Sequence, residues 1–559
     1  MKKYYLFVVS ICISIAAIAQ DSSVPLREKH VEIQEDAYAP VSRASMPKSP
    51  AYNVQSSNFF TAQVNIDENG MNIVGDAANE PSIAVDPTNP DRIVIGWRQF
   101  DTVENNFRQA GYGYSLDGGN SWTFPGVLDP GVFRSDPVLD FDAEGNFFYN
   151  SLLGSPSNFE CDVFAIRDGG VEWEAPVPAG GGDKQWMRVD HNAGVTNNYA
   201  HWNLSFTSCE GSFIRSTDGS ESFETCIDVP QDPFWGTLAV NKESILYLAG
   251  TNGTDFVVFR SLNAQDTGST IEWEDVALVD LDGQLNAGVA VNPQGLLGQT
   301  WIDVDISNGP GEGNVYVAAS VTRNSNSDPG DVMFSRSIDG GITFEDPVRI
   351  NTDDSTTNVQ WLGTMAVAPN GRIDVAWLDT RNAPEGTLFS ELYYSFSDDQ
   401  GVTWSENEVL SDAFDPTIGY PQQNKMGDYF DMVSDNEGVH LAWANTINGG
   451  QDVYYTRITP DSVLRVDEVT TATAISGFPN PFTEAITLSF NAVNQGKTSV
   501  VVYDILGRQV TTLFDQETIE EQSIIWNGTS EQDTKVTDGI YFVTITTENQ
   551  REVIRVIKQ

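Results

Sequence analysis

Arginine, carboxylate and tryptophan side chains recur at two places in a pattern that repeats along residues 53–466. One place precedes an apolar segment, and the other ends the apolar segment that follows it. Guanidinium groups bind carboxylates or sulfates through paired hydrogen bonds, and a carboxylic acid of raised pKa can donate a proton to a leaving group. Indole faces stack on sugar rings. This combination predicts a site for an acidic sugar.

The candidate residues fall into two groups by expected role. Those expected to bind the substrate are Arg98, Arg323, Arg381, Glu80, Trp186, Trp235, Trp301, Trp361 and Asp428. Those that could act in catalysis are Asp136, Asp183, Asp379, Tyr420 and Tyr429. Each residue type also has a structural explanation. Arginines can form salt bridges between loops, tryptophans can pack inside sheets, and acids such as Asp232 or Asp303 can cap neighbouring turns.

Short β-strands must position these residues. Glu80–Asp86 is followed by Ile93–Phe100, and Asp136–Asp142 is followed by Asn146–Leu153. Related pairs recur at intervals of about 50 to 65 residues, which suits a four-stranded propeller blade with variable loops. No stretch has the 3.6-residue period of an amphipathic helix. The predicted fold class is all-β, with a seven-bladed (alternatively six-bladed) β-propeller. In such a fold the two recurring places converge on one mouth of the central channel.

A second motif, Ser-x-Asp-x-Gly-x-Ser/Thr-Trp/Phe, stands late in several repeats. Its aspartates are Asp117, Asp218, Asp339 and Asp399, and Ser220 replaces the glycine of the second copy. The carboxylate can accept backbone N–H bonds within the turn, and glycine supplies a positive φ. The motif resembles the Asp-box repeat of sialidase-like β-propellers over residues 53–466. The resemblance implies that these aspartates are structural and lie on the face opposite the active site.

The resemblance also implies catalytic roles. Sialidases bind a substrate carboxylate with three arginines, and they use an aspartate as acid/base and a tyrosine, paired with a glutamate, as nucleophile. The corresponding residues here would be Arg98, Arg323 and Arg381 for the trio, Asp136 or Asp183 for the acid, and Tyr420 or Tyr429 for the nucleophile. The Phe/Tyr-Arg-Ile-Pro motif of sialidases is absent, and Asn79-Glu80-Pro81-Ser82 occupies the nearest place.

Three hypotheses for the activity follow. The first is a sialidase-like glycoside hydrolase acting on an acidic glycan. The second is a non-catalytic propeller that binds glycans or proteins at the cell surface. The third is a polysaccharide lyase, which would need a base such as His201 or Tyr420 beside an arginine. A hydrolase needs a carboxylate pair or a Tyr–Glu pair within hydrogen-bonding reach at the channel mouth, whereas a binding protein does not.

The pattern changes after Val466. Residues 467–476 are predicted to be a linker, and residues 477–559 alternate strands with turns, which predicts a small C-terminal β-sandwich. Phe478–Phe482, Tyr503–Arg508, Asp538–Tyr541 and the basic end Arg551–Lys558 resemble the type A sorting domain of the type IX secretion system. The resemblance implies export by that machinery across the outer membrane of a Bacteroidota-type bacterium. The protein is then expected to be secreted, extracellular or anchored at the outer cell surface.

The start of the chain and its composition agree with export. Residues 1–19 have the basic start, apolar stretch and small-x-small end of a signal peptide. Residues 20–52 are predicted to be a flexible lead-in. The 79 acidic and 30 basic residues give a formal net charge of −49, which argues against nucleic acid or an anionic membrane as a partner. No later stretch is long and apolar enough to span a membrane.

Cysteines and metal-binding residue types are sparse. Cys209 and Cys226 flank one predicted hairpin and are the expected disulfide, which leaves Cys161 over. The four histidines are scattered and show no zinc pattern. Asp303–Gly309 resembles a calcium loop only in part, because the glycine and glutamate of the EF-hand spacing are missing. We expect no cofactor, with calcium as the one possible ion.

Overall fold

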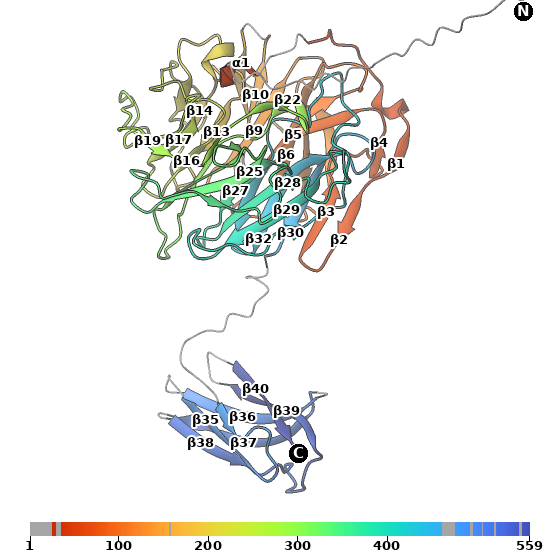
Figure 1. The fold of residues 1–559 in the computed structure, drawn as a ribbon, viewed down its shortest axis with the longest axis vertical. Helices are drawn as coiled ribbons and strands as arrows, with labels where there is room; N and C mark the ends of the chain where they lie inside the picture. The colour runs from red at the N-terminus through yellow and green to blue at the C-terminus, as the bar shows by residue number, and fades with distance from the viewer. Residues whose placement is uncertain are drawn as a thin grey trace, which may run out of the picture. The chain divides into compact units, whose positions relative to one another are not determined.

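The computed structural model describes residues 25–29, 35–155, 158–460, 476–491, 496–505, 507–518, 521–546 and 551–559. The chain divides into two compact units, residues 1–464 and 465–559 (Figure 1). The described chain is all-β apart from three short turns of helix: α1 (Leu26–Lys29), η1 (Arg43–Ser45) and η2 (Leu204–Phe206). The predicted signal peptide and nearly all of the predicted linker lie outside the described residues.

Seven antiparallel sheets of three to five strands make up most of the first unit, and its described residues also form two two-stranded sheets. Six of the seven larger sheets follow one another along the chain. The first contains β5 (Ala77–Val85), β6 (Ile93–Phe100), β7 (Gln109–Ser115) and β8 (Thr123–Val127), the second contains β9 (Ser135–Phe141), β10 (Phe147–Leu153), β11 (Glu160–Ile166) and β12 (Val177–Pro178), and the third contains β13 (Trp186–Val189), β14 (Asn198–His201) and β15 (Phe213–Ser216). The fourth contains β16 (Leu238–Val240), β17 (Leu246–Thr251), β18 (Phe256–Ser261) and β19 (Ala277–Val279), the fifth includes β23 (Trp301–Val304), β24 (Val315–Arg323), β25 (Asp331–Ser337) and β26 (Val348–Arg349), and the sixth contains β27 (Gln360–Val367), β28 (Ile373–Asp379), β29 (Glu391–Ser397) and β30 (Glu408–Val409).

The seventh sheet joins the two ends of the first unit. It contains β31 (Asp431–Asp435), β32 (Gly438–Asn445) and β33 (Asp452–Ile458), and β33 pairs with β3 (Phe59–Gln63), which pairs with β2 (Asn53–Gln55). The buried hydroxyls of Thr61 and Thr456 lie 2.9 Å apart across this pairing. The start of the unit is therefore hydrogen-bonded to its end.

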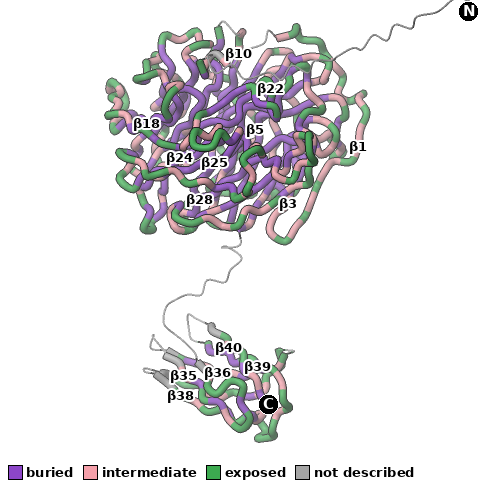
Figure 2. The backbone as a smooth tube through the Cα atoms, in the orientation of Figure 1, coloured by how far each residue is buried: buried purple, intermediate pink, exposed green. Residues whose placement is uncertain are grey.

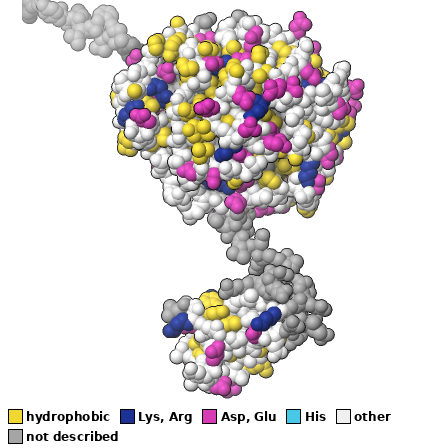
Figure 3. All heavy atoms as spheres, turned by 180° about the vertical axis from the view of Figure 1, so that it is seen from behind, with side chains coloured by type: hydrophobic (Ala, Val, Ile, Leu, Met, Phe, Trp, Pro, Cys, Tyr) yellow, Lys and Arg dark blue, Asp and Glu magenta, His cyan; other side chains and the backbone are white. Residues whose placement is uncertain are grey.

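Nearly continuous apolar runs explain the first and second strands of the sheets. All residues of β5, β6, β27 and β32 are buried, as expected for strands covered on both faces. Figure 2 shows the buried segments inside the unit and the exposed ones at its turns. Acidic side chains are dispersed over the face seen in Figure 3 rather than gathered in one patch.

The first strands of the seven sheets contact one another in a ring, in the order β5, β9, β13, β16, β23, β27, β31 and back to β5. One side chain links the backbone at each junction. The links are Ser82 with Leu139 N, Asp140 with Val189 N, Arg188 with Leu238 O, Thr237 with Ile302 N, Asp303 with Val367 N, Thr364 with Phe430 O, and Asp431 with Ile83 N. These bonds satisfy buried polar groups that would otherwise destabilise the packed strands.

The four Asp-box turns share one geometry. In the third copy, Asp339 accepts hydrogen bonds from Thr343 N at 2.9 Å, Ser337 Oγ at 2.7 Å and Thr343 Oγ1 at 2.6 Å. Asp117, Asp218 and Asp399 accept the corresponding bonds. Ser220 adopts the positive φ, 66°, that glycine adopts in the other copies. These aspartates form turns, as their sequence pattern predicts.

The predicted flexible lead-in, residues 20–52, needs correction where it is described. Leu26 in α1 is buried against the fourth and fifth sheets, and Arg27 Nη2 donates to Asp232 O at 2.6 Å. Further on, β1 (Lys48–Pro50) pairs with β4 (Met71–Ile73). Low hydrophobicity suggested flexibility, but a few apolar and charged anchors are enough to dock these segments.

The structure joins Cys209 to Cys226, the pair expected from the sequence. Cys161 is a buried free thiol. The second unit has two sheets, which contain β34 (Ser476–Phe478), β35 (Ile486–Asn491) and β38 (Glu521–Trp526), and β37 (Gln509–Thr518), β36 (Gly496–Asp504), β39 (Gly539–Thr546) and β40 (Arg551–Lys558). Apolar side chains from both sheets, including Leu488, Trp526 and Val543, form one core, as in a sandwich.

Candidate functional site

In or just before the first half of several first strands, one residue adopts a left-handed backbone conformation. The residues are Glu80 at φ 49°, Asp136 at 46°, Lys184 at 57°, Trp235 at 52° and Leu362 at 50°. Register shifts mark bulges at the starts of β5, β9 and β27. Positive φ is uncommon for residues other than glycine, and bulges redirect side chains next to functional sites. The three charged members of this set meet in one cluster.

This buried ion cluster consists of Glu80, Arg98, Asp136, Asp183, Lys184, Lys425 and Asp428. Glu80 lies 3.0 Å from Arg98 Nε and 3.0 Å from Lys425 Nζ. Asp428 Oδ2 lies 2.6 Å from Lys425 Nζ and 2.5 Å from Lys184 Nζ. Asp183 lies 3.5 Å from Lys184 Nζ. The structure therefore brings together five of the predicted site residues and adds two lysines that the sequence analysis missed.

The cluster is almost completely shielded from solvent. None of its side chains belongs to a residue more than 3% exposed. Burial raises the pKa of Glu80, while Arg98 and then Lys425 oppose that shift. Arg98 Nη1 and Nη2 have no hydrogen-bond partner among the described residues. The four carboxylates face three cations, so most of the buried charge is offset within the cluster.

A hairpin packs against the segment of the cluster that contains Asp428, residues 426–428. The hairpin is formed by β21 (Ala287–Val289) and β22 (Asn292–Leu296). Leu296 N donates to Asp428 Oδ1 at 2.9 Å, and Asn292 Nδ2 donates to Gly427 O at 2.7 Å. In return, Met426 N donates to Asn292 Oδ1 at 3.0 Å. These bonds hold the hairpin against Asp428 and the two residues before it.

The two candidate nucleophiles are not activated. Tyr429 donates its hydroxyl to Pro137 O at 2.6 Å, and burial together with the charges of Glu80 and Asp136 raises its pKa well above the usual value. Burial also raises the pKa of Tyr420, with Asp415 adding to the shift. A tyrosine nucleophile needs the opposite shift or an adjacent base. Tyr429 is next to the cluster, whereas Tyr420 forms no bond to it among the described residues.

The three predicted arginines do not form one trio. Arg98 bonds to Asn79 and pairs with Glu80. Arg323 holds Asp282 and Asp331 instead, and Arg381 holds Asp379 at 2.6 Å. A separate network, in which Asn351 links Asp331 to Gln360 and Gln360 links to Asp379, connects the last two. The sequence pattern places all three arginines at the ends of second strands. It did not reveal that Arg323 and Arg381 would form ion pairs with carboxylates near them in space.

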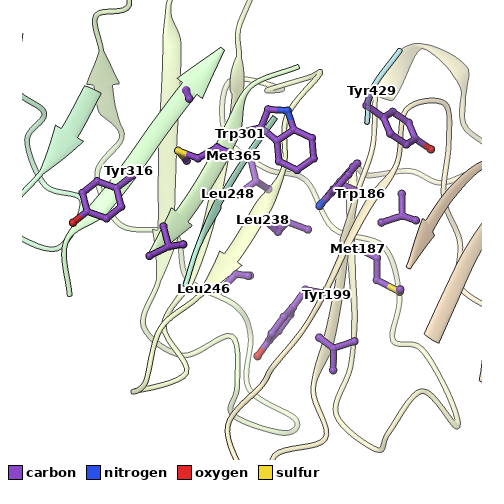
Figure 4. Close-up of a cluster of buried hydrophobic side chains, with 14 of the residues drawn as sticks. Trp186, Met187, Tyr199, Leu238, Leu246, Leu248, Trp301, Tyr316, Met365 and Tyr429 are labelled. Atoms are coloured by element: carbon purple, nitrogen blue, oxygen red, sulfur yellow. The ribbon is translucent and has the colours of Figure 1, made fainter. Parts of the chain in front are cut away.

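The four predicted tryptophans also divide. Trp235 and Trp361 are buried in hydrophobic cores between sheets, and Trp361 Nε1 donates to Ser390 Oγ at 3.2 Å. Trp186 and Trp301 also belong to a buried hydrophobic cluster, and they line a pocket as well. Their rings lie edge to face with centroids 5.0 Å apart, and Trp186 lies between Trp301 and Tyr429 (Figure 4).

The lyase candidate His201 is a packing residue by its contacts. Its ring nitrogens lie 2.8 Å from Ser212 O and 3.0 Å from Pro233 O. Burial lowers its pKa to about 4. Asp232, near this position, offers its carbonyl to Arg27 rather than its carboxylate to the ion cluster.

The pocket that contains Trp186 and Trp301 has a volume of about 720 Å³ and is lined by first strands of all seven sheets. We call it the central pocket. Its wall includes the carboxylates of Asp140, Asp303 and Asp431 and the guanidinium of Arg188, of which only Asp303 stood out in the sequence. A single acid inside an apolar strand is the signal that could have identified the other two. Gly118 of an Asp-box turn also lines the pocket, so it opens toward that end of the strands.

In the part of the chain that the structure describes, no group of three or more histidine, cysteine, aspartate or glutamate side chains is placed to hold a metal ion. No helix among the same residues is long and apolar enough to cross a membrane.

The C-terminal unit matches a known family. Residues 476–559 match the model described as the secretion system C-terminal sorting domain. This segment is a secretion sorting domain. It directs the protein to the cell surface or the extracellular space, as predicted from Phe478–Phe482 and the following motifs. No curated protein matches the chain in sequence.

Solved structures resemble the chain only distantly. A protein of unknown function from Dyadobacter fermentans is 14% identical with a TM-score of 0.41, over 72% of this chain and 98% of that one. An α-L-arabinofuranosidase of Fusarium graminearum with arabinobiose is 13% identical with a TM-score of 0.41, over 74% and 99%. Trypanosoma rangeli sialidase is 10% identical with a TM-score of 0.36, over 89% and 89%. Similarity at this level does not bear on function.

Proposed function

We propose that the first unit is a seven-bladed β-propeller that binds a ligand at the cell surface without hydrolysing it. The blade assignment is supported by the seven sheets, the ring of first strands and the side-chain link at each junction. The pairing of β3 with β33 supports a closed ring, because it fastens the last sheet to the start of the chain.

One observation carries the binding function. Among the carboxylates at the predicted channel mouth, Glu80, Asp183 and Asp428 are paired with lysines or arginine, and all of them, Asp136 included, belong to residues at most 3% exposed. A general acid and a nucleophile must reach the substrate to act. Glu80, Asp136 and Asp183 do not meet this condition, because they are buried. A glycan or a protein segment is the partner class that a surface-displayed propeller would bind.

A sialidase-like hydrolase is the second candidate. It is favoured by the proximity of Glu80, Asp136 and Tyr429, whose charges influence one another. It would require the buried ion cluster to open to the substrate and Arg98, with its unpartnered Nη1 and Nη2, to bind the substrate carboxylate.

Incubation of the full secreted chain with sialylated, uronic-acid and sulfated glycans tests this proposal. We expect no reducing ends and no unsaturated products, with binding measured in parallel. Turnover that disappears in Glu80→Gln, while the Tm is unchanged, would establish the hydrolase instead. Unsaturated products would indicate a lyase.

A further inference from the structure

The central pocket combines apolar walls with carboxylates that lack cations. Its volume of about 720 Å³ falls in the range of small-molecule sites. Trp186, Met187, Trp301 and Met365 form part of the apolar wall, and Figure 4 shows Met365 and Trp186 on either side of Trp301. Such a wall suits an apolar body rather than a bare, hydrated ion.

The charged groups of the wall are unevenly paired. Arg188 Nη1 lies 3.7 Å from Asp140, and His191 Nε2 lies 2.8 Å from the same carboxylate. Asp303 accepts hydrogen bonds from backbone N–H groups, and Asp431 accepts them from backbone N–H groups and from Ser82 Oγ, but among the described residues neither carboxylate forms an ion pair. Two carboxylates therefore face the pocket with no cation of their own within salt-bridge distance.

The pKa values agree with this geometry. Burial raises the pKa of Asp431 to about 7 and raises that of Asp303 as well. Arg188 opposes both shifts without cancelling them. A cation inside the pocket would stabilise the ionised carboxylates and lower both pKa values.

A polar atom of another residue that lines the pocket also lacks a partner. Ser434 lines the pocket, is 8% exposed, and its hydroxyl has no hydrogen-bond partner among the described residues. The hydroxyl can accept an N–H bond from a ligand. A metal ion is less suitable than an organic cation, because no three carboxylate or imidazole groups of the described chain converge on one point.

We propose that the central pocket binds an organic cation, an ammonium or guanidinium group on an apolar stem, with the charge against Asp303 and Asp431 and the stem against Trp186 and Trp301. The inference deepens the proposed binding function and rests on it. The same headgroup can come from a free amine or from a lysine or arginine side chain of a protein segment.

Calorimetric titration of the full secreted chain at pH 8 tests the ligand class. The probes are hexylamine, the neutral 1-hexanol, and short acetylated peptides with a central lysine or norleucine. We expect each cation to bind at least tenfold more tightly than its neutral counterpart. Tighter binding of the lysine peptide than of hexylamine would identify a protein segment as the source of the cationic headgroup. Tighter binding of hexylamine would identify a free amine. Equal affinity for cation and neutral analogue, or no cation binding, overturns the proposal.

Matched variants test the site. Asp303→Asn and Asp431→Asn remove the charge and keep one oxygen, which can accept one of the two backbone N–H bonds that each carboxylate accepts on separate oxygens. Each should weaken cation binding at least tenfold, whereas Asp339→Asn in an Asp-box turn should leave it unchanged. If Asp431→Asn does not fold, Asp303→Asn and the pH profile of the unaltered chain decide, because affinity should fall as pH drops below about 7. Unchanged affinity in folded variants would contradict the assignment.

The two proposals fail in different ways. Glycan turnover in the preceding assay would overturn the non-catalytic function and leave the amine titration interpretable. Absence of both turnover and amine binding would overturn only the cation pocket.

Discussion

Lys184 and Asp428 form a buried ion pair between the segments that lead into β13 and β31, with 2.5 Å between Nζ and Oδ2. Asp428 also accepts a hydrogen bond from Lys425 Nζ at 2.6 Å. One carboxylate thus offsets two ammonium groups in the interior, and it ties the third sheet to the seventh.

Asp428→Asn is expected to destabilise the first unit strongly. Removing one partner of a buried ion pair costs about 3–5 kcal/mol, and Asp428 bonds to two buried ammonium groups. Because Glu80 and Asp183 still lie beside Lys425 and Lys184, we expect a loss at the lower end of that range. Denaturant unfolding at pH 7 measures the change. Glu274→Gln is the control, because its pair with Arg260 at 3.5 Å is partly exposed and such pairs contribute about 0–1 kcal/mol. Equal effects of the two substitutions would show that the cluster is not a stabilising element.

Asp452 is expected to make the first unit less stable as pH rises. Burial, and then the nearby carboxylate of Asp76, raises its pKa to about 8, whereas an unfolded aspartate titrates near 3.9. The folded state therefore holds the proton more tightly. Stability from this group is fully present below about pH 4 and is lost as pH rises through the folded pKa of about 8.

Asp452→Asn should remove that loss of stability, because an asparagine side chain does not titrate. Its amide oxygen can still accept the hydrogen bond from Asn65. We expect the fall in unfolding free energy between pH 5 and pH 8.5 to shrink by about 1 kcal/mol or more, since one pKa unit corresponds to about 1.4 kcal/mol. The pKa of Asp339 is lowered to about 2, so Asp339 stays ionised between pH 5 and pH 8.5. Asp339→Asn should therefore not alter how the unfolding free energy changes with pH in this window. An identical pH slope for Asp452→Asn and the unaltered chain would contradict the assignment.

The strands and turns of the first unit were predictable because their signals are local. Runs such as Ile93–Phe100 are buried on both faces, and the Asp-box turn is encoded in about eight residues. Ser220 shows how strong the turn is, since it adopts a glycine-like φ without glycine. By contrast, β3 pairs with β33 across nearly the whole unit, and no repeat motif in residues 53–63 indicates that partner.

The site was less predictable, because it depends on which charges meet after folding. Glu80, Arg98 and Asp428 do come together, but Lys184 and Lys425 provide the other cations. Lysine follows no fixed spacing in the repeat, and Lys425 stands in an irregular segment. Arg323 stands at the same place in its repeat as Arg98 does, yet it pairs with Asp282, 41 residues away, and is not part of the buried ion cluster.

Gly401→Ala is expected to destabilise the first unit, and Ser220→Gly is its matched control. Gly401 has φ 79°, and a Cβ there would lie 2.4 Å from a ring carbon of Phe334 in the preceding sheet. The left-handed conformation alone costs a non-glycine residue about 1–2 kcal/mol, and displacement of the ring adds to this. Ser220→Gly relieves the same strain in the second Asp-box but removes the hydroxyl that accepts a hydrogen bond from Asn198 Nδ2 at 3.0 Å, so we expect a smaller change in Tm than for Gly401→Ala. Thermal unfolding of both variants measures the difference, and a Gly401→Ala Tm equal to that of the unaltered chain would refute the packing role.

Deletion of residues 476–559 is expected to abolish delivery to the cell surface while leaving the first unit folded. The deleted segment is the matched sorting domain, and it has its own hydrophobic core, so its removal exposes no core of the first unit. Fractionation of the producing cells, with antibody detection of the first unit, measures the distribution. The full chain with an equivalent tag is the control. A truncated chain that reaches the surface or medium as efficiently as the full chain would show that the export signal lies elsewhere.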